Sequence, residues 1–188
     1  MLIHKKLISV VLMLTLVSLA CMMNIGGPAY PIPSIPVSTE AIASLNQAIQ
    51  TAEAVGIESG TLILAITEEQ LTSYLAIKLQ AQGNPLLSNP QVYLQDGQIH
   101  IYGTATQGYF QVTARIILTA GVDQQGQMKI ELTSADFGPM PVPSGVNLAI
   151  TALIKEAFTG SLGPVATGMR LESITISNGA MVIVGRIK

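Results

Sequence analysis

The sequence predicts an α+β domain in which a curved antiparallel sheet, built from hairpins, carries helices packed on its concave face. Two observations favour this class. Segments 92–103 and 174–185 place Asp-Gly or Asn-Gly between runs of alternating apolar residues, a pattern typical of hairpins with two-residue turns. Segments 38–55, 67–82 and 144–158 carry apolar residues at helical spacing. Because strands joined by tight turns pair antiparallel, we expect one antiparallel sheet with separate helices.

The first helix is predicted from Ser38 to Val55. Ser38 is a favoured N-cap residue, and Gly56 suits the position just after a helix. One face of this helix is apolar: Ile42, Leu45, Ile49 and Ala52.

A buried strand and a second helix follow directly. The run from Gly60 to Ile66 has the length and composition of a buried strand. Thr67 and Gln70 then form a capping box, in which each side chain satisfies a backbone amide of the other. The helix is expected to end near Gln82, with a core stripe of Leu71, Leu75 and Leu79.

The two hairpins fix their own pairing if each turn has two residues. In the first, Leu94 should face Ile99 and Val92 should face Ile101, with Tyr93 and His100 on the opposite face. The second should pair Ile176 with Met181 and Ile174 with Ile183. Their equal spacing permits a duplication, although turn chemistry alone also produces it.

Between the hairpins we expect two more strands and a third helix. The strands are 111–120 and 128–135. Three prolines at 139, 141 and 143 should then end the sheet. The helix is expected at 144–158, where apolar residues again follow one stripe.

The N-terminal segment has the pattern of an export signal. Lys5 and Lys6 precede an apolar run from Leu7 to Ala20, which is short for a membrane span. Continuation of this run through residue 23 keeps a single N-terminal span as an alternative. The residues Val17-Ser18-Leu19-Ala20-Cys21 resemble the lipobox of bacterial lipoproteins, although that family usually has Leu where Ser18 stands.

This resemblance implies a diacylglycerol thioether on Cys21 and cleavage after Ala20. An ordinary signal peptide that happens to contain a cysteine is the alternative. Cys21 is the only cysteine of the chain, so an exported protein cannot use it for an internal disulfide. We therefore expect a signal at 1–20, a lipidated Pro-rich tether at 21–37 and a single domain at 38–188.

Composition excludes some partners. Of the 188 residues, 49% are hydrophobic and only 11% are charged, against roughly 25% charged in ordinary soluble domains. Removal of Lys5 and Lys6 with the leader leaves seven basic and eleven acidic residues, a net charge of −4. A mildly acidic body argues against nucleic-acid binding.

No residue pattern indicates catalysis, a metal or a cofactor, and we predict that the protein is not an enzyme. His100 is the only histidine after the leader, so it lacks a second histidine or cysteine for a metal site, and we expect it at the surface. Glu68 and Glu69 are adjacent carboxylates, but at the start of a helix they complement its dipole.

Three short segments resemble the YpmS-like and LmeA-like families of extracytoplasmic proteins. They are Thr67-Glu68-Glu69-Gln70-Leu71, the hairpin from Leu94 to Gly103, and Gly138-Pro139-Met140-Pro141-Val142-Pro143. The resemblance spans about residues 60–187 and implies a half-tubular, lipid-binding-like architecture, with no catalytic residues to transfer.

The function expected is lipid or apolar-ligand binding by an exported protein, anchored through Cys21 to the outer face of the cell membrane, or in the periplasm if there is an outer membrane. Eight apolar positions would line a groove or simply fill the core: Leu71, Leu75, Val92, Leu94, Ile99, Ile101, Ile174 and Ile183. The alternative is a non-enzymatic scaffold of the cell envelope that presents an apolar face or a free sheet edge to a protein partner.

Overall fold

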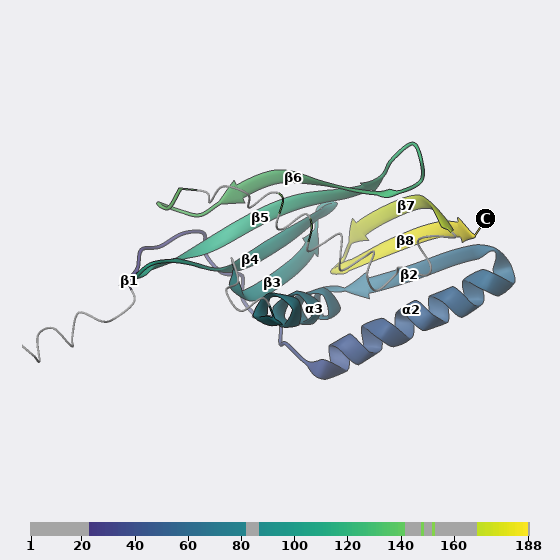
Figure 1. Cartoon of the computed structure of the whole chain (residues 1–188), viewed down its shortest axis with the longest axis horizontal. Coiled ribbons are helices and arrows are strands. Elements are labelled where there is room, and N and C mark those ends of the chain that lie inside the picture. Colours follow the sequence, from purple (N-terminus) through teal and green to yellow (C-terminus); the bar gives the residue numbers. More distant parts are fainter. Residues whose placement is uncertain (1–22, 82–86, 142–147, 149–151, 153–168, 188) are drawn as a thin grey trace, which may run out of the picture.

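The computed structural model describes residues 23–81, 87–141, 148, 152 and 169–187. Across 23–81, 87–141 and 169–187 it contains two helices and eight strands, arranged as an elongated α+β molecule (Figure 1). The elements are β1 (Met23–Asn24), α2 (Thr39–Ser59), β2 (Thr61–Thr67), α3 (Glu68–Ala81), β3 (Ser88–Gln95), β4 (Gln98–Gln107), β5 (Phe110–Val122), β6 (Met128–Asp136), β7 (Met169–Ser177) and β8 (Ala180–Ile187).

The strands form two sheets where one was predicted. In the larger sheet, β3, β4 and β5 are consecutive neighbours, and the far edge of β5 pairs with β6 over one part of its length and with β1 over another. The smaller sheet has the order β2-β8-β7. Figure 1 shows the two sheets curling side by side along the long axis, with α2 and α3 on one side. The hairpins therefore form as expected, but β2 and β3 belong to different sheets. Helix α3 connects these two strands in the chain.

Both predicted hairpins are confirmed in register. Leu94 pairs with Ile99 and Ile176 with Met181, so the alternate apolar residues face inward as expected. Asp96 and Gly97 both have positive φ, 53° and 74°, which is the conformation of a type I′ turn. The strands predicted at 111–120 and 128–135 are β5 and β6, each slightly longer than expected.

Helix α2 begins as predicted but ends four residues later. The Ser38 side chain accepts a hydrogen bond from the Ala41 amide at 3.0 Å. Gly56, expected after the helix, lies inside it and is buried, whereas Gly60 ends the helix at a φ of 73°. A glycine inside a helix costs only about 1 kcal/mol, and the last turn leads directly into β2.

The capping box of α3 is confirmed. The Thr67 amide donates to Gln70 Oε1 at 3.0 Å, and the Gln70 amide donates to Thr67 Oγ1 at 3.3 Å. The same helix also covers the edge of β3. The Glu68 carboxylate accepts from the Leu94 amide at 2.7 Å, and the Thr72 hydroxyl accepts from the Val92 amide at 2.9 Å. Glu68 is therefore a structural acceptor at the edge of β3 that does not pair with β4.

Residues 23–37 are the described part of the predicted Pro-rich tether. The segment lies on the larger sheet through a series of hydrogen bonds: Met23 N to Tyr109 O, Ile25 N to Gln111 O, Thr113 N to Gly26 O, Tyr30 Oη to Asn89 O, Tyr93 Oη to Pro33 O, and Gln91 Nε2 to Ile35 O. Gly27 passes so close to β5 that a side chain there would collide with the Thr113 carbonyl. The prolines do exclude a helix, but polar groups of the sheet dock the segment.

The third predicted helix, at 144–158, lies outside the described residues except for Leu148 and Ala152, which are helical. No helix in the described part of the chain is long and apolar enough to cross a membrane.

Candidate functional site

The eight apolar positions proposed for a groove belong to the core. Seven are buried, and Ile174 is partly buried against the same cluster. None of the eight lines the cavity between α2 and β2 or the one between α3 and β3. They fill the interior because the inward residues of both sheets meet the buried faces of α2 and α3 in one continuous core. Of the two options left open by the sequence, the structure favours filling.

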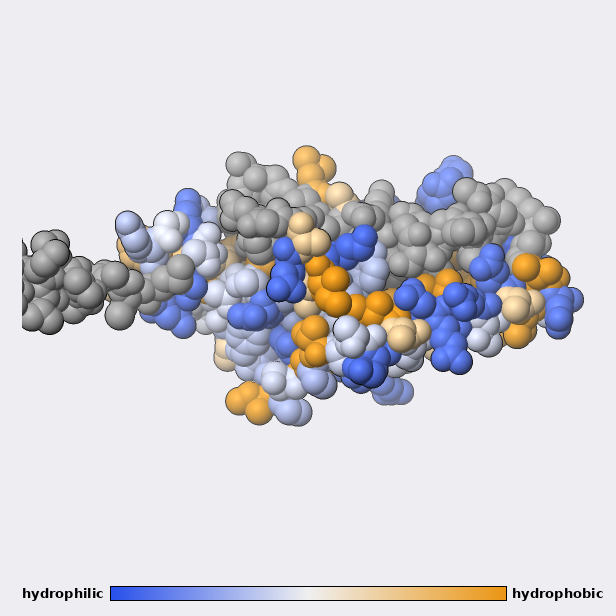
Figure 2. All heavy atoms as spheres, turned by 60° about the horizontal axis from the view of Figure 1, so that its bottom comes forward, coloured by the Kyte–Doolittle hydropathy of each residue, from blue (hydrophilic) through white to orange (hydrophobic). Residues whose placement is uncertain are grey.

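A different groove lies where α2 folds back along β2. It has a volume of about 570 Å³, within the usual range for small-molecule sites. Its wall on the helix is Ser44, Gln47, Ala48, Thr51, Ala52, Val55 and Ser59, and its wall on the strand is Thr61, Ile63, Leu64 and Ala65. Figure 2 turns this side of the molecule forward and shows a broken band of hydrophobic side chains between hydrophilic ones.

Strand β2 reaches this groove at its edge. Ile63, Leu64 and Ala65 are consecutive, and successive side chains of a strand point to opposite faces. Leu64 is buried in the core, whereas Ile63 and Ala65 are exposed. In the described part of the chain, β2 pairs with β8 alone. The groove therefore combines a helix face of small, aliphatic and uncharged polar residues with the edge of β2 that does not pair with β8.

The lining of the groove carries no charged side chain. Two of its hydroxyls already have internal partners: Ser44 accepts from Gln70 Nε2 at 3.0 Å, and Ser59 donates to the Val55 carbonyl at 2.8 Å. The remaining surface consists mainly of alanine and aliphatic groups. Such a lining suits an uncharged, apolar ligand, because a charged group would lose its hydration without gaining an opposite charge.

Sequence reasoning missed this groove, although one signal was present. The run from Leu62 to Ile66 is apolar at every position, so both faces of β2 are apolar, and a strand with one solvated face would alternate. Ile63 points away from the core and is exposed. The exposed Val55 of α2 lines the same groove, so apolar side chains from two elements gather at this surface.

A second, smaller cavity of about 430 Å³ lies between α3 and the start of β3. It is lined by Val37, Ala76, Leu79, Gln80, Leu87, Ser88, Asn89, Pro90 and Gln91. Residues 82–86, which connect its two walls in sequence, lie outside the described part of the chain. The α2–β2 groove is therefore the better-defined site.

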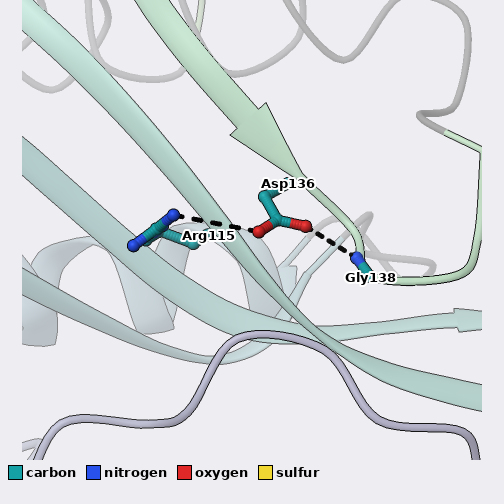
Figure 3. A network of polar contacts seen from close by, with 3 residues as sticks. All are labelled: Arg115, Asp136 and Gly138. Carbon is teal, nitrogen blue, oxygen red and sulfur yellow. Dashed lines mark hydrogen bonds and ion pairs between the residues drawn. The ribbon is translucent and has the colours of Figure 1, made fainter.

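The described residues contain no group of three or more His, Cys, Asp or Glu side chains that could bind a metal ion. Asp136, at the end of β6, has structural partners instead. Its carboxylate lies 3.8 Å from the Arg115 guanidinium and accepts from the Gly138 amide at 2.9 Å (Figure 3). This contact joins β5 to the turn after β6.

His100 was expected at the surface and is instead buried. It shares the outer face of the sheet with Tyr93, as predicted, but neither ring nitrogen has a hydrogen-bond partner in the described structure. Burial, and then the positive charge of Arg115, lower the pKa of His100, and the more weakly acting Asp96 opposes them. The folded environment therefore favours the neutral imidazole over the charged one.

The buried neutral imidazole predicts a loss of stability in mild acid. The unfolded protein binds a proton near the ordinary histidine pKa of about 6.5, whereas the folded protein does so only at lower pH, because its pKa is lowered. The free energy of unfolding should therefore fall as the pH drops below about 6.5 and through the folded pKa. Urea denaturation of the wild-type protein and His100→Gln across this range tests it. We expect a flatter pH profile for the variant, and parallel profiles would contradict the prediction.

Comparison with protein-family models and with curated proteins finds no match. Among solved structures, the chain is similar to one described as the crystal structure of lipopolysaccharide binding protein, with 12% sequence identity and a TM-score of 0.29. The match covers 69% of this chain and 49% of that one, so the chain spans about half the length of its neighbour. The class defined by the molecule itself is an α+β protein with a curled half-barrel sheet and two described helices.

Proposed function

We propose that this protein is an exported lipoprotein, anchored to a membrane through Cys21, that binds the apolar part of a lipid in the groove between α2 and β2. The observation that carries the proposal is the groove itself, an uncharged and largely apolar concavity of about 570 Å³. In this proposal the helices cover the concave side of the curled sheet, and the protein has no enzymatic role.

The chemistry of the groove defines the class of ligand. Each methylene group transferred from water into such a surface contributes about 0.8 kcal/mol. With no charged residue in the lining, a head group gains nothing by entering and would stay in solvent. An acyl chain or a similar aliphatic segment fits these requirements better than a phosphate, a sugar or a peptide carboxylate.

Native mass spectrometry of a protein that begins at Met22, and so retains every described residue, tests the proposal directly. A co-purifying apolar molecule near one per protein molecule, identified after organic extraction, is the expected result. An apo mass that stays unchanged after incubation with phospholipid vesicles would overturn it. Omission of Cys21 ensures that any lipid observed is not the anchor.

A groove-filling substitution gives the residue-level prediction. Thr51→Trp places a large side chain in the groove from an exposed helix position, and should weaken binding of a fluorescent fatty acid by about tenfold or more, since losing two methylene contacts already costs about 1.6 kcal/mol. Ala54→Trp is the matched control, because Ala54 is exposed on the same helix but does not line the groove. Equal affinities for the two variants would place the ligand elsewhere.

Protein interaction is the second candidate function, favoured by the edge of β2. In the described structure this edge has no strand beside it, and the nearby Ile63 is exposed. Open edges accept strands from partner proteins. A photoreactive amino acid at position 63 distinguishes the two functions in living cells. Lipid adducts would support ligand binding, whereas a discrete protein adduct would support the scaffold.

A further inference from the structure

We propose that the turn between β4 and β5, together with Met23, contacts the surface of the bilayer in which the protein is anchored. This inference rests on the proposed membrane anchoring and is independent of the α2–β2 groove. The surface, called the apolar tip below, consists of Met23, Tyr109 and Phe110. These three side chains are 60%, 77% and 47% exposed, respectively.

The apolar tip is built on well-defined backbone geometry. Gln107 pairs with Phe110, so the turn consists of two residues, Gly108 and Tyr109. Gly108, the first of them, has a φ of 60°. Glycine at this position is typical of a type II′ turn. Met23 pairs in parallel with Phe110, and its amide donates to the Tyr109 carbonyl at 3.0 Å. Backbone hydrogen bonds thus bring two segments distant in sequence into one tip.

The position of the apolar tip in the sequence identifies the bilayer as its partner. Met23 is two residues after Cys21, and two residues span at most about 7 Å. A lipid on Cys21 therefore places the acyl–water boundary close to the tip, and an uncut N-terminal span would do the same. Figure 1 shows β1 and this turn at one end of the long axis, opposite the C-terminus.

The composition around the apolar tip suits the membrane interface. Neither 23–39 nor 97–114, the two segments that contain the tip, has an Asp, Glu, Lys or Arg residue. Tyrosine is enriched at membrane interfaces, where its ring is buried and its hydroxyl stays hydrated, and phenylalanine inserts its ring beside it. Insertion of these two segments would therefore desolvate no charged side chain of their own, and contact should not depend on anionic lipid.

Tryptophan is absent from the sequence, so a single Tyr109→Trp substitution reports on the apolar tip alone. The full lipidated protein would be reconstituted in phosphatidylcholine vesicles containing a brominated phosphatidylcholine. We expect a blue-shifted emission, quenching by the brominated lipid and protection from aqueous iodide. Ile57→Trp is the matched control. Ile57 is 68% exposed near the C-terminal end of α2, at the other end of the long axis, and should remain open to iodide and untouched by brominated lipid.

Flotation of the vesicles distinguishes failure of the anchoring proposal from failure of the contact proposed for the apolar tip. If the protein floats and the tryptophan at position 109 behaves like the one at position 57, the anchoring proposal stands and the contact proposed for the apolar tip is wrong. If the protein does not float, both fail. A second substitution, Phe110→Ser added to Tyr109→Trp, should reduce the lipid quenching while flotation stays unchanged. Quenching that is insensitive to Phe110→Ser would contradict joint insertion of the two rings.

Discussion

Replacement of Cys21 by serine is expected to abolish lipidation of the protein. A serine hydroxyl cannot form the thioether that the lipobox resemblance implies, and there is no second cysteine to substitute for it. Without the lipid, the mature form that begins at residue 21 should also disappear. Metabolic labelling with a radioactive fatty acid, followed by N-terminal mass analysis, measures both effects. All of the label should be lost, because the proposed lipid is carried by Cys21 and the chain has no other cysteine.

The neighbouring substitution Met22→Ser is the control for this experiment. It changes one apolar residue just beyond the expected cleavage site and leaves Cys21 intact, so labelling should persist. A wild-type protein that takes up no label would refute the lipoprotein proposal. Its N-terminus would then separate the alternatives, because cleavage elsewhere indicates an ordinary signal peptide, and retention of residue 1 indicates an N-terminal span.

The features that could be predicted from sequence are those set by neighbouring residues. The Asp96-Gly97 turn requires positive φ at two successive residues, which few other dipeptides adopt, so its hairpin and register followed from the sequence. The capping box of Thr67 and Gln70 acts over three residues and was equally visible. In α2, by contrast, Gly56 was predicted to follow the helix, but it lies buried inside the helix, and Gly60 ends it.

The features that were missed depend on contacts between distant segments. Alternation correctly placed His100 on the outer face of its strand, but its burial depends on what packs against that face. Prolines correctly excluded a helix before residue 38, but docking of this segment depends on Tyr93 and Gln91 of β3. The α2–β2 groove likewise depends on how the whole of α2 packs along β2, and no local pattern encodes that packing.

The difference between core and groove predicts a large effect for Leu94→Ala. Leu94 is only 1% exposed, pairs across the hairpin with Ile99 and belongs to the continuous core. Truncation of a buried leucine to alanine typically costs about 2–5 kcal/mol, from lost transfer energy and the cavity left behind; we expect about 3 kcal/mol here. Since whole domains are stable by about 5–15 kcal/mol, urea denaturation should show a clearly lower midpoint with a similar slope.

Ile63→Ala is the control for this substitution, since Ile63 is exposed and truncation there should change the free energy of unfolding by only about 0.5 kcal/mol. The two substitutions should have the opposite order of effects on ligand binding. If Leu94 fills the core and Ile63 lines the groove, fatty-acid affinity should fall for Ile63→Ala and stay unchanged for Leu94→Ala at a temperature where both variants are folded. The reverse pattern, a stable Leu94→Ala variant with impaired binding, would show that the inward face of the sheet binds the ligand after all.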